Sequence, residues 1–380
     1  MDSTHLLTRI SQRQATLAQQ GLLRQRQFRT AVPGQPAKIS QAQAELVNFA
    51  SNDYLGLSFA PEVADALYQG AQQYGAGSTA SPLVSGYSDA HYQLEQALAT
   101  ACNAEASLLF SSGFAANTAL LKTLFAAQDL VLADKLIHAS MIDGLRDAQV
   151  KLKRFPHNDV TAAARMFESA VPLALVTESV FSMDGDEAPL LTLQQLCAEH
   201  NCPLIVDDAH GFLLTDNVPI VPFARVVTFG KTLGCQGAAI IGSQQLIDFL
   251  VANSREYIYS TALSPACCTA TLAALHIAQT GAPQQRLKQN IALFRQLAEA
   301  AGLTLMPSAT AIQPLVVGDC ERVLRIAQQL SCKGFLIGAI RPPTVPQGSA
   351  RLRITLSASH TAEHIQQLVA AITEVLDVNA

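Results

Sequence analysis

The 380-residue sequence has no tryptophan, and only 14% of its residues are charged. It contains no block of basic residues and its net charge is −5, so nothing in it favours a surface built to bind nucleic-acid phosphates. Its apolar runs are too short to cross a bilayer. With 49% hydrophobic residues the chain can bury a large core, and we expect at least two domains.

The eight cysteines include no Cys-x-x-Cys pair. A chain this long and apolar does not need disulfides, so we expect mostly buried, reduced thiols. The N-terminal stretch has neither a basic start followed by an apolar block nor a small-residue cleavage site. We therefore expect a cytoplasmic protein that binds neither nucleic acid nor membranes.

The apolar pattern divides the chain into three parts. Residues 4–29 have a narrow apolar face at helical spacing, which predicts an N-terminal helical arm over residues 1–45. Over residues 46–285, near-continuous apolar runs alternate with helical stretches, and this indicates an α/β domain with a mainly parallel sheet covered on both faces. The expected strands of this large domain are 106–110, 130–133, 173–177, 203–206, 225–229 and 238–241.

The last part of the chain has a different pattern of expected helices and strands. A long helical region near residues 265–300 leads into short strands at 311–317, 335–339 and 351–356, which alternate with helices at 320–332 and 361–377. This pattern predicts a smaller α+β domain over residues 286–380.

Lys231 is one of only eight lysines, and it follows the apolar run 225–229 and Gly230. Removing an ammonium from water without a partner costs several kcal/mol, so a lysine at the end of a buried strand is usually paired or chemically used. Desolvation favours the neutral amine, a nucleophile that can form a Schiff base. The alternative, a side chain that bends out to solvent on its long stem, has about equal weight on this segment alone.

Ligands of open α/β sheets bind at the carboxyl ends of the strands, so the residues that follow each run matter most. Ser111-Ser112-Gly113-Phe114 lies at a strand-to-helix turn, where free backbone N–H groups favour a phosphate, although a plain helix cap is also possible. Further polar side chains follow three other runs. They are His138, Glu178 with Ser182, and Asp207 with Asp208 and His210.

Asp207 and Asp208 have no cationic partner among the next residues, and burying such a carboxylate is costly. A cofactor with a protonated ring nitrogen would meet that need. Pyridoxal phosphate has this nitrogen, and it also requires a lysine for its aldehyde and an N–H-rich pocket for its phosphate.

Two other ligands fit these residues less well. Asp207, Asp208 and His210 could bind a divalent metal, but the Lys231 cation beside them would repel the ion. No second His cluster has metal-ligand spacing. We therefore expect no metal. A nicotinamide site is disfavoured because no Gly-x-Gly-x-x-Gly follows a first strand.

Six segments resemble the α-oxoamine synthase family of pyridoxal-phosphate enzymes, and they occur in that family's order. They are 51–57 (SNDYLGL), 85–87 (SGY), 112–117 (SGFAAN), 181–186 (FSMDGD), 207–211 (DDAHG) and 228–231 (TFGK). The resemblance implies a fold-type I homodimer with the cofactor at the subunit interface and a seven-stranded sheet in the large domain. Residues 339–346 and 351–356 most resemble the family member that joins L-alanine to a pimeloyl thioester, carried on coenzyme A or acyl carrier protein.

The resemblance also implies roles for individual residues. Lys231 would form the Schiff base and return as general base, Asp207 would pair with the pyridinium nitrogen, and His138 would stack on the ring. Ser182 and His210 would bond the phenolic oxygen. Gly113, Phe114 and Thr228 would bind the phosphate, together with Ser260 and Thr261 of the neighbouring subunit. Arg24, Asn52, Thr344 and Arg353 would handle the substrates. The residues expected in the chemistry are Lys231, His138, Asp207, His210, Asn52 and Glu178.

Two segments depart from the family pattern. Residues 78–83 replace a more glycine-rich stretch that usually carries a basic residue near Leu83, and residues 232–236 differ from the usual glycine-rich run. The first departure bears on the acyl-donor contacts.

The activity that the resemblance implies is a decarboxylative condensation in biotin biosynthesis. The alternatives are a sister enzyme that uses glycine, making 2-amino-3-oxobutyrate or 5-aminolevulinate, and a non-catalytic cofactor-binding protein.

Overall fold

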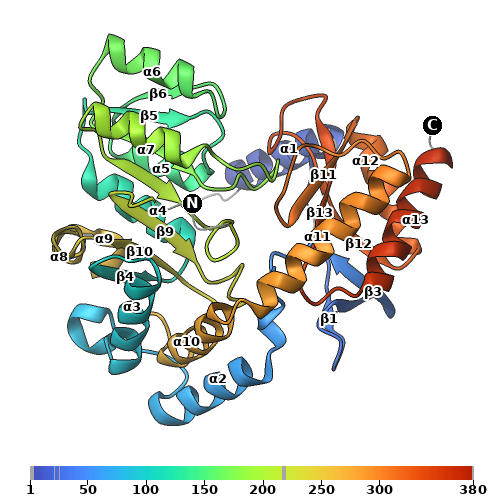
Figure 1. The fold of residues 1–380 in the computed structure, drawn as a ribbon, viewed down its shortest axis with the longest axis horizontal. Helices are drawn as coiled ribbons and strands as arrows, with labels where there is room; N and C mark the ends of the chain where they lie inside the picture. Colours follow the sequence, from blue (N-terminus) through green and yellow to red (C-terminus); the bar gives the residue numbers. More distant parts are fainter. Residues whose placement is uncertain (1–3, 21, 25, 216–219, 379–380) are drawn as a thin grey trace.

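Seven strands between residues 106 and 242 form a single sheet in the order β4-β10-β9-β8-β7-β5-β6 (Figure 1). The computed structural model describes residues 4–20, 22–24, 26–215 and 220–378. The strands are β4 (Ala106–Phe110), β5 (Leu130–Asp134), β6 (Lys151–Phe155), β7 (Ala174–Glu178), β8 (Leu204–Asp207), β9 (Ala224–Thr228) and β10 (Ala238–Gly242). Only β10 runs antiparallel to its neighbours, so the prediction of a mainly parallel sheet is confirmed.

Side chains alternate between the two covered faces of this sheet, as the pleat requires. In β10, Ala238 and Ile240 pack in one hydrophobic cluster with α4 and α5, whereas Ala239 and Ile241 pack in another with α3 and α10. The large-domain helices are α2 (Pro61–Tyr74), α3 (Asp89–Ala101), α4 (Gly113–Leu124), α5 (Ala139–Asp147), α6 (Val160–Ser169), α7 (Leu190–Glu199), α8 (Gln244–Asn253), α9 (Arg255–Ile258) and α10 (Pro265–Gln279). Both faces of every central strand are therefore apolar.

The smaller domain has a six-stranded sheet in the order β1-β2-β3-β12-β13-β11. Its strands are β1 (Thr30–Ala31), β2 (Lys38–Gln41), β3 (Ala44–Phe49), β11 (Ile312–Gly318), β12 (Phe335–Ile340) and β13 (Ala350–Thr355), and its helices are α11 (Ala282–Ala300), α12 (Cys320–Cys332) and α13 (Ala362–Val378). The domain limits drawn after residues 45 and 285 stay a prediction. Residues 30–49 share this sheet because β3 pairs in parallel with β12.

Two expected helices differ in length from those in the structure. The N-terminal helix α1 (Thr4–Gln19) ends ten residues before position 29, and none of its residues is buried within this chain. The long helical region expected near 265–300 is two helices, because Gly281 adopts a positive φ of 74° between α10 and α11. No helix of the described residues is long and apolar enough to cross a membrane.

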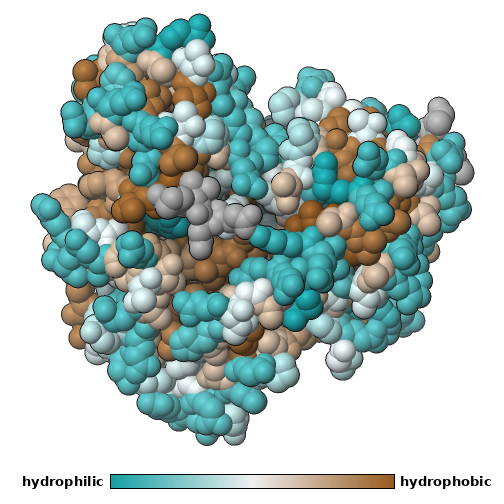
Figure 2. Space-filling model, in the orientation of Figure 1, coloured by the Kyte–Doolittle hydropathy of each residue, from teal (hydrophilic) through white to brown (hydrophobic). Residues whose placement is uncertain are grey.

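The eight cysteines are all free, but the expectation that most are buried is only partly met. Cys197, Cys202 and Cys268 are buried, Cys332 is exposed, and the other four are partly exposed. Hydrophilic side chains cover most of the face shown in Figure 2, and hydrophobic ones gather near the recess between the two lobes.

Candidate active site

A cavity of about 460 Å³ lies at the carboxyl edge of the large sheet. It is lined by residues at or just after the ends of β4, β5, β7, β8 and β9, together with Asn52, which follows β3. The parallel strands bring these ends to one edge, although they are far apart in the sequence. The expected gathering of strand-end residues is therefore found.

Lys231 lies in the tight connection between β9 and β10. The connection is closed by hydrogen bonds from the Phe229 N–H to the Gly237 carbonyl (2.9 Å) and from the Cys235 N–H to the Phe229 carbonyl (2.8 Å). Lys231 Nζ lies 2.9 Å from His210 Nε2 and does not bend out to solvent. Burial lowers the pKa of Lys231, as does Arg353, while the carboxylates of Asp207 and Glu178 act in the opposite direction.

A hydrogen-bonded chain connects Lys231 to Arg353. His210 Nδ1 lies 2.5 Å from the Tyr54 hydroxyl, which donates to Asn52 Oδ1 (3.3 Å), and Arg353 Nη1 donates to the same Asn52 oxygen (3.1 Å). The His210 tautomer with its proton on Nδ1 satisfies every one of these contacts, with Nε2 accepting from the Lys231 ammonium. Burial and the cationic neighbours lower the pKa of His210 well below its ordinary value, so the ring is neutral.

The two neighbouring carboxylates of segment 207–208 have different partners. Asp207 Oδ2 accepts a 2.6 Å hydrogen bond from Asn117 Nδ2, and its Oδ1 accepts one from the Ala209 N–H (3.0 Å). Asp208 forms a 3.0 Å ion pair with Arg225 and a 2.5 Å hydrogen bond with the Ser179 hydroxyl. The residues that follow in the sequence include no cation, and Arg225 on the adjacent strand was missed as the partner of Asp208. The pair is therefore not arranged as a joint metal-binding site.

A polar pocket at the start of α4 has the features of a phosphate site. Ser112 caps the helix by accepting from the Ala115 N–H (3.2 Å), and the buried hydroxyl of Thr228 has no hydrogen-bond partner among the described residues. A Cβ added at Gly113 would lie 2.4 Å from Thr228 Cγ2, so a larger residue there would require Thr228 to shift. Phe114 is half exposed, and its ring meets the His138 ring edge-on at 6.5 Å.

His138 and Glu178 complete the cavity wall. His138 caps α5 through Nδ1, which accepts from the Ser140 N–H (3.3 Å) and lies 2.7 Å from the Ser140 hydroxyl. Partial burial lowers the pKa of His138, Asp207 opposes the shift and Lys231 adds to it. Glu178 pairs in register with Asp207, and burial beside that carboxylate raises the pKa of Glu178 well above its ordinary value.

Several predicted site residues are not among those that line this cavity. Arg24 Nη2 donates to the Thr344 hydroxyl (3.3 Å), so these two candidates for substrate contacts lie together. Arg353 Nε donates to the Ser182 carbonyl (2.6 Å), so the main chain of Ser182 has a structural partner. The contact expected from the Ser182 side chain to the cofactor stays a prediction. Ser260 and Thr261 are exposed, and their expected contact with a neighbouring subunit also stays a prediction.

Two residues with evident roles were missed as site residues. Asn117 lies four positions after Gly113, so both occupy one face of α4, and this spacing was a usable signal. Tyr54 lies in the 51–57 segment, but nothing in the sequence links it to His210, 156 residues away. The atypical segment 232–236 contributes Cys235 and Gln236 to the cavity lining.

Comparisons with known proteins show the family of this chain. The model of the family "Aminotransferase class I and II" matches residues 44–372. An 8-amino-7-oxononanoate synthase of Sodalis glossinidius (strain morsitans) is 45% identical over 91% of this chain and 92% of its own length, and one of Saccharophagus degradans is 42% identical over 93% and 92%. The crystal structure of 8-amino-7-oxononanoate synthase from Francisella tularensis superposes with a TM-score of 0.76 at 30% identity, over 88% of this chain and 98% of that one. The chain therefore belongs to the aminotransferase class I and II family and to its 8-amino-7-oxononanoate synthase branch.

Proposed function

We propose that the protein condenses L-alanine with a pimeloyl thioester and releases carbon dioxide, the free thiol carrier and 8-amino-7-oxononanoate, a step of biotin biosynthesis. The observation that carries this proposal is the position of the Lys231 amine, 2.9 Å from a neutral His210 in a cavity that also holds Asp207. The names of the relatives at 45% and 42% identity support the choice of substrates.

The residues of the cavity fit pyridoxal phosphate. The partnerless Thr228 hydroxyl, Gly113 and the start of α4 suit its phosphate, and the Asp207 carboxylate suits its ring nitrogen. His138 has an accessible ring beside these groups. When bound, pyridoxal phosphate supplies an aldehyde that exchanges between amines and a ring that takes up electrons from the α-carbon and the carboxyl group of an amino acid.

Lys231 would hold the aldehyde of the cofactor, and its amine would be the base that takes the α-proton of alanine. Its lowered pKa favours the neutral form that this step requires. Asp207, kept in place by Asn117, would hold the proton on the ring nitrogen. His138 would cover the ring and hydrogen-bond the carbonyl of the acyl group. Arg353 would bind the alanine carboxylate through Nη2, because its Nε and Nη1 already donate to Ser182, Asn52 and Thr355.

We also propose that the acyl chain passes the contact between Arg24 and Thr344, which joins the N-terminal segment to the small domain. The active enzyme is a homodimer that works in the cytoplasm. The exposed Ser260 and Thr261 lie outside this chain's own cavity, in accord with a role in the neighbouring subunit's phosphate site.

The test is an assay of carbon dioxide and free thiol release with the purified holoenzyme. The amino acids are L-alanine, glycine and L-serine, and the acyl donors are pimeloyl, succinyl and acetyl thioesters of coenzyme A, with pimeloyl-acyl carrier protein. We expect the largest kcat/KM with L-alanine and a pimeloyl thioester. A preference for glycine with acetyl- or succinyl-coenzyme A would replace the proposal with a sister activity. Absence of turnover with all combinations would favour a binding protein.

A further inference from the structure

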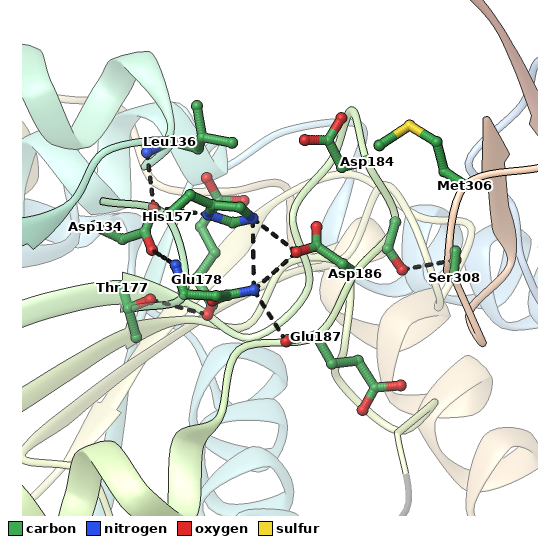
Figure 3. A network of polar contacts seen from close by, with 12 residues as sticks. Asp134, Leu136, His157, Thr177, Glu178, Asp184, Asp186, Glu187, Met306 and Ser308 are labelled. Carbon is green, nitrogen blue, oxygen red and sulfur yellow. Dashed lines mark hydrogen bonds and ion pairs between the residues drawn. The ribbon is translucent and has the colours of Figure 1, made fainter. Parts of the chain in front are cut away.

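Both ring nitrogens of His157, which directly follows β6 and Pro156, face carboxylates. Nδ1 lies 3.0 Å from Asp134 Oδ1 and Nε2 lies 2.7 Å from Asp186 Oδ2 (Figure 3). A neutral imidazole can donate through only one nitrogen, so this geometry suits the doubly protonated ring. The Asp134 side chain is only 1% exposed, and a carboxylate so deeply buried needs a cation beside it.

The two carboxylates belong to segments that carry residues of the active site. Asp134 ends β5 and accepts hydrogen bonds from the main-chain N–H groups of Leu136 and Asn158, both 2.8 Å, and so shapes the turn that leads to His138. Asp186 lies in the loop 181–187 that follows β7 and also accepts from the Asn158 side chain (2.8 Å). His157 therefore joins the His138 turn to this loop.

The small domain contacts the same loop from its other side. The Ser308 hydroxyl donates to the Gly185 carbonyl (2.7 Å), Arg351 pairs with Asp184, and Arg353 Nε donates to the Ser182 carbonyl (2.6 Å). The last contact matters most, because Arg353 is the residue proposed to bind the substrate carboxylate. The loop thus separates His157 from Arg353 and touches both.

The charges around His157 are nearly balanced. Asp184 also brings a carboxylate oxygen near, since one atom each of His157, Asp184 and Asp186 lie within 4.8 Å of one another. Three carboxylates, from β5 and the loop, then face two cations, His157 and Arg351 of β13. The ring also meets the Phe181 ring edge-on at 4.3 Å, and Asn158 Nδ2 lies 3.4 Å from His157 Nε2. Loss of the histidine charge would leave the loop with excess negative charge.

We propose that His157 is a positioning residue whose imidazolium holds the loop 181–187 against Asp134, so that the Ser182 carbonyl orients Arg353 toward the substrate carboxylate. The proposal deepens the proposed function and rests on it, because the function assigns the carboxylate to Arg353. His157 itself touches neither cavity nor substrate. It acts through Asp186 and the loop.

The test compares His157→Gln, Asp186→Asn, the double variant and a matched control, His276→Gln, whose side chain is exposed on α10. Each of the first two should raise the KM for L-alanine about tenfold, the size expected when a buried charged group loses its hydrogen bonds, with the KM for the pimeloyl thioester unchanged. The double variant should show the same rise as the singles, because both changes act through one contact. A rise of about a hundredfold in the double variant would overturn the proposal.

Hydrogen–deuterium exchange gives a readout that does not depend on catalysis. In His157→Gln, amides of residues 181–187 should exchange faster, while those of helix α3 should keep their rate. Unchanged exchange in the loop, or equally faster exchange in α3, would overturn the proposal. Arg353→Gln tests the assignment of Arg353 separately from the role of His157. If that variant keeps its KM for L-alanine while the loop still exchanges faster in His157→Gln, then His157 positions the loop but Arg353 does not bind the substrate carboxylate.

Discussion

Asn117 Nδ2 donates a 2.6 Å hydrogen bond to Asp207 Oδ2, and this contact from helix α4 fixes the carboxylate at the end of β8. Asp207 has no ion-pair partner among the described residues, so its orientation depends on this amide and on the Ala209 N–H.

Asp207→Asn should lower kcat by about 100-fold or more, because the charge that holds the cofactor's ring proton is lost. Asn117→Ala should lower kcat about tenfold, because the carboxylate stays but loses its orientation. Steady-state kinetics with saturating cofactor measure both. The control is Asn253→Ala, at the exposed end of α8. If Asn117→Ala behaves like this control, the amide does not orient Asp207.

Lys231→Ala should reduce turnover by about 1,000-fold or more, because it removes both the aldehyde-binding amine and the general base. Borohydride treatment of the wild-type holoenzyme should add the cofactor mass to the peptide that contains Lys231, and mass spectrometry should find no such adduct in the variant. Lys135→Ala, an exposed lysine, serves as control. Normal activity of Lys231→Ala would remove the basis of the proposed mechanism.

Tyr54→Phe should lower kcat/KM for L-alanine about tenfold, because it interrupts the hydrogen-bonded chain from Lys231 to Arg353 and leaves the buried Nδ1 of His210 without its partner. Burial raises the pKa of Tyr54 to about 12, although Arg353 opposes the shift, so the hydroxyl is present throughout the working pH range. Tyr92→Phe, 54% exposed on α3, is the matched control. Equal kinetics of the two variants would show that the chain has no role in catalysis.

Gly113→Ala should weaken the binding of pyridoxal phosphate about tenfold or more, because the new Cβ would lie 2.4 Å from Thr228 Cγ2 beside the proposed phosphate site. Thr228→Ser removes that methyl group and keeps the hydroxyl. The double variant should therefore recover most of the affinity, as measured by absorbance titration of the apoprotein. Failure of the serine change to restore binding would mean that the clash is not the cause.

The stability of the protein should depend on pH through His157. Burial alone would lower the pKa of His157, but hydrogen bonds and charges of Asp134 and Asp186 raise it to about 10, above the ordinary 6.5. The folded state then binds the proton more tightly than the unfolded chain, so the stabilisation is complete below pH 6.5 and is lost as the pH rises through about 10. The difference in free energy of unfolding between wild type and His157→Gln, from denaturant titrations, should shrink over that range. A difference that does not change with pH would exclude a charged His157.

The strongly apolar strands were predicted within one or two residues, because both of their faces are buried and their composition shows it. Strand β6 was missed. Its sequence, Lys151-Leu152-Lys153-Arg154-Phe155, lies at the edge of the sheet with several exposed side chains, so it has no continuous apolar run. The pairing of β3 with β12 joins residues nearly 300 positions apart, and no local pattern contains that contact.

The site residues show the same difference between local patterns, which could be predicted, and long-range contacts, which could not. Residues directly after strands, such as Lys231 and Asp207, could be collected from the sequence because parallel strands place their ends at one edge. Contacts between side chains on different helices and strands could not be predicted from the sequence. Arg225 is 17 residues from Asp208 and Tyr54 is 156 residues from His210, and only the folded chain brings these side chains together.

The closed connection between β9 and β10 has a consequence for the reactive amine it carries. Thr232 and Leu233, the two residues after Lys231, are fully buried, so the backbone beneath the lysine cannot swing away when its side chain is displaced. In the proposed mechanism, the free amine would then sample only the small volume that its own four-carbon stem can reach. Its effective concentration at the reacting carbon would stay far above that of any amine in solution, and the same lysine would be ready to return within the turnover.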